Sequence, residues 1–192
     1  IDRLPPPKTV PPGALEQTYF PNQNEDEPGL LLYAWPPERD LWAGEEFLLE
    51  LFIGNLSSGE TSNLYKKFID SETRIMDIGA NAVFGWLDTD PGHPVYIGFN
   101  NVNRDATEIA MMDSVRAVIA AEIETISEYS DGSSELQAFN ERAKNRVIER
   151  QRDLRKFLNT PPRFGFRGTG SRWLEHLKHM QKIDGFRKNL TL

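Results

Sequence analysis

The chain has 192 residues, of which 39% are apolar and 27% are charged, a balance typical of a globular protein. It contains no cysteine, which excludes disulfides, thiolate metal sites, iron–sulfur clusters and cysteine nucleophiles. No apolar run approaches the roughly 18 residues that a membrane-spanning helix needs, so we expect no membrane insertion. The sequence leaves the compartment open, with an intracellular location slightly favoured.

Charge is divided unevenly along the chain. The net charge is −7, yet residues 1–140 hold 8 Lys and Arg against 24 Asp and Glu, whereas residues 141–192 hold 14 against 5. Such a division indicates an anionic partner for the basic end, whether nucleic acid, a membrane surface or an acidic protein. The alternatives are that the basic segment folds back onto the acidic body, or that copies of the chain meet head to tail.

The first segment, residues 1–28, is predicted to be an extended, proline-rich arm. Nine of the 13 prolines fall within the first 37 residues, and proline fixes φ and disfavours helix in the residue before it. Such an arm is either a linker or a segment that lies along a partner. Its apolar residues favour docking, and the candidate partner-binding residues are Leu4, Pro6, Val10, Tyr19 and Phe20.

The acidic part, residues 29–104, is predicted to be rich in strands. Short runs of apolar or β-branched residues bounded by Pro, Gly and Asn indicate strands. We expect strands over residues 30–35, 46–53, 74–78, 82–87 and 95–99, and a short helix over residues 61–70. An antiparallel sheet is the simplest arrangement, with a hairpin loop over residues 88–94.

The remaining part, residues 105–192, is predicted to be helical with a basic C-terminal segment. Apolar residues from Ile109 to Ile126 recur at steps of three and four, and the same spacing resumes after residues 130–133. Two long helices joined by so short a link are expected to form an antiparallel helical hairpin. A shorter helix is expected over residues 171–182.

The expected fold class is therefore α+β: a small, mainly antiparallel sheet, then a long helical hairpin and a short C-terminal helix, preceded by the extended arm. Residues 29–192 are expected to form one domain.

A glycine-rich loop before the last predicted helix is a candidate anion or nucleic-acid site. Helix N-termini expose N–H groups that bind anions, and phenylalanines stack on bases. Alternatively the glycines permit tight turns while the phenylalanines anchor the loop in the core. The candidate residues are Arg163, Phe164, Phe166, Arg167 and Arg172.

A metal site is a further hypothesis, built from one loop and the last predicted helix. His176 and His179 are three residues apart and share a helix face, and Asp90 and His93 belong to the loop before the last strand. Surface histidines and Asp-Pro-Gly turns also occur without metal, and no metalloprotease or calcium-loop motif is present.

Basic residues also recur on the second long helix. Arg142, Arg146 and Arg150 share one side of it, where they either form a solvated face or meet Glu122, Glu124 and Glu128 across the hairpin, or an acidic partner.

These patterns favour a non-enzymatic structural or adaptor subunit that works through protein–protein contacts of its arm and its charged helices. A protein partner or self-association is expected, and no cofactor or small-molecule substrate is inferred. The alternatives are a protein that binds nucleic acid or phosphate, and a metal-dependent hydrolase.

Overall fold

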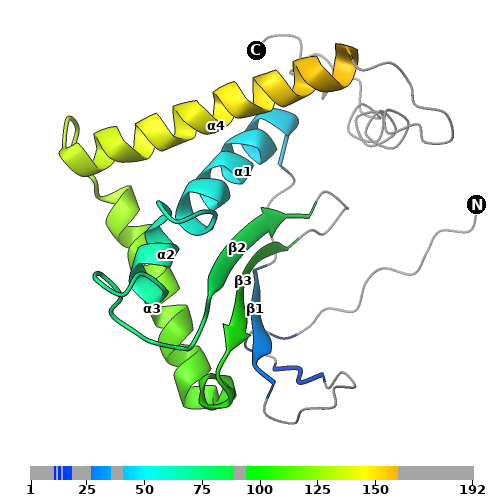
Figure 1. Ribbon diagram of the computed structural model, residues 1–192. Coiled ribbons are helices and arrows are strands. Elements are labelled where there is room, and N and C mark those ends of the chain that lie inside the picture. The colour runs from blue at the N-terminus through cyan, green and yellow to red at the C-terminus, as the bar shows by residue number, and fades with distance from the viewer. Residues whose placement is uncertain are drawn as a thin grey trace, which may run out of the picture.

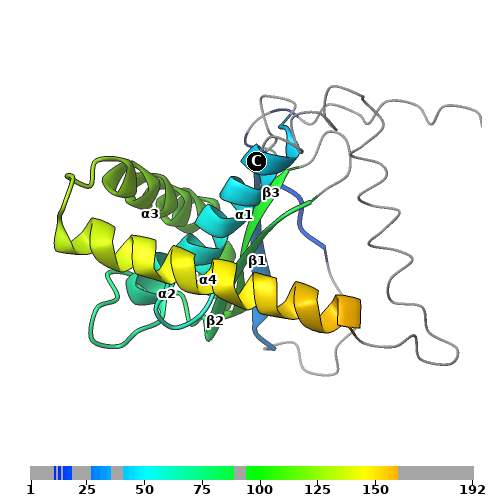
Figure 2. The ribbon, with the colours of Figure 1, turned by 90° about the horizontal axis from the view of Figure 1, so that it is seen from above.

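The computed structural model describes residues 11, 13, 15–18, 27–35, 41–88 and 94–159. They form a three-stranded antiparallel sheet with helices on one of its faces, which confirms the predicted α+β class. Figures 1 and 2 show the shorter helices on one side of the sheet, while the longest helix crosses past one end of it. No helix in the described ranges combines the length and the apolar character needed to cross a membrane.

The sheet has the order β1-β3-β2, so the last strand in the chain lies in the centre. Strand β1 is Gly29–Trp35, β2 is Ala82–Leu87 and β3 is Val95–Val102. Leu31 of β1 and Val83 of β2 both pair with Phe99 of β3, and all three side chains are buried. These three strands were predicted from the sequence.

Helix α1, Ala43–Ser57, occupies a region that was predicted to be a strand, residues 46–53. That prediction was wrong because the run carries the periodicity of a strand and also that of a helix. Its apolar residues alternate, as in a strand, but Leu49, Ile53 and Leu56 also recur at steps of four and three, as in a helix. Leucine and glutamate favour helix, and Glu45 accepts a hydrogen bond from the Trp42 N–H at 3.0 Å before the first turn.

Residues 74–78 were also predicted to be a strand and are irregular instead. An ion pair of 2.8 Å joins Arg74 to Asp77, and the Asp77 carboxylate accepts a hydrogen bond from the Gly79 N–H. Gly79 has a φ of +76°, which turns the chain where an extended strand would continue. Ile78 nevertheless reaches the core, where it is 1% exposed.

The core lies between the inner face of the sheet and three helices. Helix α2 is Asn63–Phe68, within the predicted helix, and contributes Leu64 and Phe68. A short 3₁₀ turn, Arg104–Thr107, precedes helix α3, Ile109–Ser127, which contributes Val115 and Ile119. The predicted stripe on α3 is therefore buried at its centre, while Ile109 at its start is 68% exposed.

Helix α4, Ser134–Asn159, forms an outer layer and does not pair with α3. The two helices follow one another through a short turn, as predicted, but Figure 1 shows them diverging, and the extensive contacts of α4 are with α1. The expected antiparallel packing of the hairpin was wrong. Polar groups on α1 attract α4, as described below.

Tyr33 joins β1 to α3, because its hydroxyl donates a hydrogen bond of 2.8 Å to the Met112 carbonyl. Burial raises the pKa of Tyr33 above its ordinary value of 10; nearby Arg116 opposes the shift and Asp113 adds to it. Since the folded-state pKa is the higher one, the contribution to stability is complete below about pH 10 and is lost as the pH rises further.

Tyr33→Phe should therefore lower the free energy of unfolding by about 0.5–1.5 kcal/mol near neutral pH. The difference between the wild type and this variant should stay constant up to about pH 9 and shrink as the pH rises above about 10, measured by urea denaturation at each pH. A difference that stays constant across that rise would contradict this role.

Candidate functional site

The site residues predicted from the sequence all lie outside the described residues. They are the arm residues Leu4, Pro6, Val10, Tyr19 and Phe20, the anion-site residues Arg163, Phe164, Phe166, Arg167 and Arg172, and the metal-site residues Asp90, His93, His176 and His179. The short helix predicted over residues 171–182 lies outside them as well. In the described ranges, no three His, Asp or Glu side chains gather closely enough to hold a metal ion.

Three arginines of α4, Arg142, Arg146 and Arg150, interact with α2, with α1 and with the residue that follows α1, rather than with the glutamates of α3. Arg146 donates from Nε to Asn55 Oδ1 at 2.9 Å and from its terminal nitrogen to the Ser58 carbonyl. Asn55, which is fully buried, also donates to the Phe139 carbonyl at 3.2 Å. A buried amide with its oxygen and nitrogen both bonded stabilises this contact, so α4 is fixed across α1.

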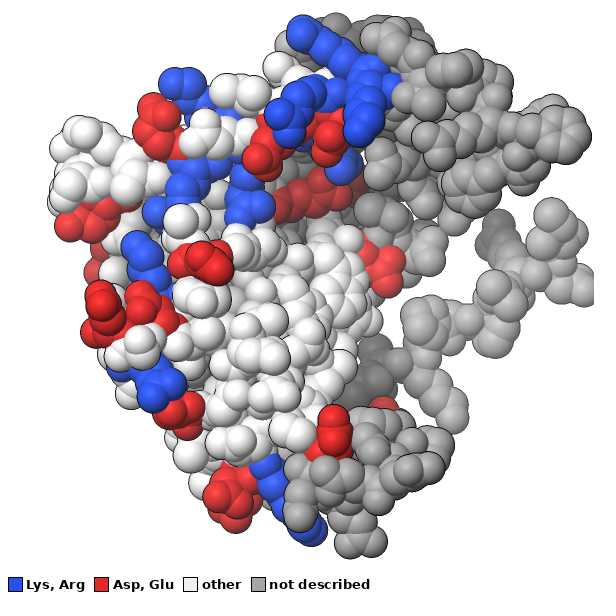
Figure 3. All heavy atoms as spheres, in the orientation of Figure 1, with Lys and Arg blue, Asp and Glu red and all other residues white. Residues whose placement is uncertain are grey.

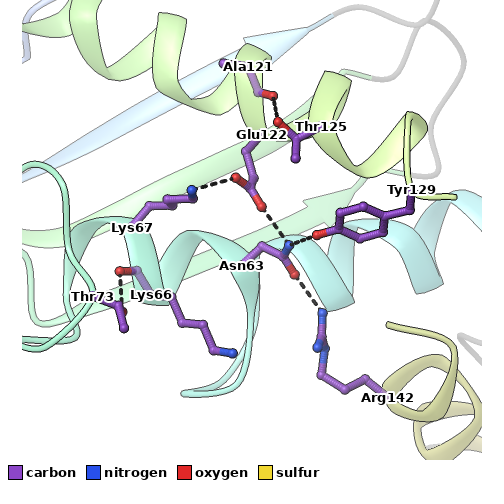
Figure 4. Close-up of polar contacts among 9 residues, drawn as sticks. All are labelled: Asn63, Lys66, Lys67, Thr73, Ala121, Glu122, Thr125, Tyr129 and Arg142. Atoms are coloured by element: carbon purple, nitrogen blue, oxygen red, sulfur yellow. Dashed lines mark hydrogen bonds and ion pairs between the residues drawn. The ribbon is translucent and has the colours of Figure 1, made fainter. Parts of the chain in front are cut away.

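A second polar cluster joins α2, the end of α3 and the beginning of α4 (Figure 4). Its members are Asn63, Lys67, Glu122, Tyr129 and Arg142. Glu122 is 6% exposed and pairs with Lys67 at 3.1 Å, while its other carboxylate oxygen accepts a hydrogen bond of 2.7 Å from Asn63 Nδ2. Asn63 Nδ2 also lies 3.3 Å from the Tyr129 hydroxyl.

Asn63 is the centre of this cluster because it bonds to groups of opposite charge. Its nitrogen donates to the Glu122 carboxylate, and its oxygen accepts a hydrogen bond of 2.7 Å from Arg142. Burial lowers the pKa of Arg142; nearby Tyr129 opposes the shift and Arg146 adds to it. An arginine keeps its charge through such a shift, and its guanidinium lies 5.4 Å from the centre of the Phe139 ring.

A hollow of about 440 Å³ opens beside this cluster. Its lining carries both signs of charge, Lys66, Lys67 and Arg142 against Glu122 and Glu135. Both carboxylate oxygens of Glu122 already accept interactions from Lys67 and Asn63, which leaves this group poorly placed to take a proton from a substrate. The arrangement is typical of a polar network that holds three helices together and not of a catalytic site.

The second candidate site is the outer face of the sheet, on the side away from the helices. Alternation along the strands and the register of the pairs place nine residues there. We call this set the outer sheet face: Leu30, Leu32, Ala34, Ala82, Phe84, Trp86, Tyr96, Gly98 and Asn100. Leu30, Leu32 and Trp86 are 54%, 42% and 41% exposed, although each is a large apolar residue.

Three aromatic rings form a row on the outer sheet face. Trp86 stacks on Tyr96 at 4.6 Å and on Phe84 at 5.8 Å, with interplanar angles of 21° and 15°. Gly98 makes room for this row, because a side chain there would meet the end of the Phe84 ring at 2.5 Å. The row therefore lies close to the strands, with neighbouring rings stacked on one another.

The outer sheet face carries no Lys, Arg, Asp or Glu. In the space-filling view, the surface over β2 is white, whereas charged side chains gather over the helices (Figure 3). Exposed apolar patches of this kind mark protein interaction surfaces more often than they mark surfaces left to water. This site was missed from the sequence, yet a signal was present: residues 82–87 are apolar on both alternating faces, and helices cover one of them.

Comparison of the chain with models of protein families, with curated proteins and with solved structures found no significant match.

Proposed function

We propose that this chain is a non-enzymatic subunit that works by protein–protein contact, with the outer sheet face as its contact surface. The observation that carries the proposal is the row of Phe84, Trp86 and Tyr96, in which Trp86 is exposed and the other two rings are half-buried, beside two exposed leucines with no charged group among them. Leaving such a surface in water costs about 25 cal/mol for each Å² of apolar area, which burial against a partner would recover.

The chemistry of this face favours an extended, uncharged and proline-containing segment as its occupant. Proline rings pack on flat aromatic surfaces, and a polyproline helix is already ordered, so little conformational entropy is lost on binding. The face is also flanked by edge strands, since β1 and β2 each pair with β3 alone among the described strands. An extended segment can add main-chain hydrogen bonds at such an edge.

The contacts of α4 weigh against nucleic acid as the main partner. Arg142 and Arg146 bond to side chains and a carbonyl of this same chain, and Arg150 lies 3.9 Å from Glu50. Arginines engaged in this way are less available to phosphate than a free basic face would be. A phosphate-binding protein and a metal-dependent hydrolase therefore remain hypotheses that depend on residues outside the described ranges.

The test is a calorimetric titration of the full chain with a synthetic peptide of ten prolines, which is uncharged and unrelated to this sequence. We expect binding that Trp86→Glu weakens at least about ten-fold, because a carboxylate placed against a proline ring loses its water. Ile75→Glu is the matched control, since Ile75 is 64% exposed and lies outside the face. Equal affinity of the wild type, Trp86→Glu and Ile75→Glu would refute the outer sheet face as the contact surface.

A further inference from the structure

The chain itself contains a segment with the chemistry that the outer sheet face requires. Residues 4–15 include five prolines, at positions 5–7, 11 and 12, and their one charged residue is Lys8. The apolar residues Leu4, Val10 and Leu15 stand among these prolines. The segment is therefore apolar, nearly uncharged and biased to an extended conformation.

The length of this segment matches the length of the face. The face runs from Leu30 to Ala34 along β1, a distance of about 13 Å at 3.3 Å per residue. Residues 5–12 in a polyproline helix extend about 25 Å at 3.1 Å per residue, enough to cross the face with ends to spare. Residues 13–28 separate the prolines from β1 and, when extended, span up to about 50 Å, which is sufficient to reach another molecule.

The described residues of the arm are not buried against their own chain. Pro11, Gly13 and residues 15–18 are all exposed, and Leu15 is 56% exposed although it is apolar. Apolar residues therefore remain unburied on the arm and on the face of the same molecule. Exchange between two copies would bury both at once, and a mutual exchange closes a dimer with twofold symmetry.

We propose that residues 4–15 of one copy dock on the outer sheet face of a second copy, so that the chain assembles by exchanging its arm. This inference rests on the proposed function, because it names the occupant of the same face. The arm supplies the prolines and the face supplies the aromatic row. Each molecule therefore docks its own arm on its partner and binds the arm of its partner on its own face.

The test measures the mass of the full chain by analytical ultracentrifugation. The wild type should form a dimer. Two kinds of variant should each raise the dissociation constant of the dimer at least about ten-fold. The face variant is Trp86→Glu or Leu30→Glu. The arm variant has glycine in place of Pro5, Pro6, Pro7, Pro11 and Pro12. Leu48→Glu, at a residue 64% exposed on α1, and Pro28→Gly are the matched controls and should leave the dimer intact. Circular dichroism verifies that every variant is folded.

Mixing the two variants gives the sharpest result. The Trp86→Glu chain keeps an intact arm, and the arm variant keeps an intact face, so their mixture should form a one-to-one dimer that neither forms alone. A wild type that stays monomeric, or a mixture that does not associate, would overturn arm exchange. A dimer that the face variant loses and the arm variant keeps would also overturn it. Binding of the decaproline peptide that depends on Trp86 would still support the proposed function in each of these cases.

Discussion

Replacing Phe68 by alanine should lower the free energy of unfolding by about 3–5 kcal/mol, the cost of removing a fully enclosed aromatic ring. Phe68 is 0% exposed and meets the Phe99 ring edge to face at 4.9 Å, so the cavity would open between α2 and the central strand. Phe99 is buried by the same contact, and both rings would lose their partner.

Phe47→Ala provides the matched control, because Phe47 is 37% exposed on α1. Its loss should cost less than about 1.5 kcal/mol, since most of the contacts of a buried ring are absent there. Urea denaturation of the two variants and the wild type measures the difference. Equal losses would show that the core is not centred on the Phe68–Phe99 contact.

The second large effect is expected at Gly85, where α1 passes close to β2. A Cβ at Gly85 would meet the Ser57 hydroxyl, lie 2.8 Å from Ile53 Cγ2 and lie 3.0 Å from the Tyr96 carbonyl oxygen. The Tyr96 carbonyl belongs to the main chain of β3 and cannot turn aside, so the new methyl group would press on Ser57 and Ile53 and force α1 away from the sheet. Gly85→Ala should therefore cost about 1–3 kcal/mol.

Gly98→Ala tests the same argument on the opposite face of the sheet. Its Cβ would meet the end of the Phe84 ring, which can swing outward into solvent. We expect a loss of less than about 1 kcal/mol in urea denaturation, because a flexible side chain yields more cheaply than a packed helix. Similar losses in the free energy of unfolding for Gly85→Ala and Gly98→Ala would contradict the close approach of α1 to β2.

Local patterns in the sequence were sufficient for most of the elements. The turn residues between β2 and β3 predicted their antiparallel pairing, and the stripe on α3 predicted that Val115 and Ile119 would be buried. The failure at α1 has a local cause, since both periodicities are present in one apolar run. Helix propensity and the acidic first turn decide between them.

The packing of α4 and the outer sheet face depend on information that no local pattern carries. The sequence allowed the arginines of α4 either a solvated face or acidic partners, but Arg142 and Arg146 bond to the neutral side chains of Asn63 and Asn55. A hydrogen bond from an arginine to a buried asparagine cannot be predicted from the spacing of apolar residues or from the number of charged residues. The outer sheet face is uncovered in the described part of the chain because the helices there that contact the sheet lie on its other side, which is a property of the whole fold.

Helix α4 is long, and its C-terminal part extends beyond the contacts that attach it to α1. It contains 26 residues and is therefore about 39 Å long at 1.5 Å per residue. Its attachments at Arg142, Arg146 and Arg150 lie within its first 17 residues, and residues 151–156 beyond them are exposed. A tilt of about 10° around Arg146 would move the far end by about 3 Å, given the same rise per residue. Small adjustments of the Asn55 contact are thereby amplified along the helix.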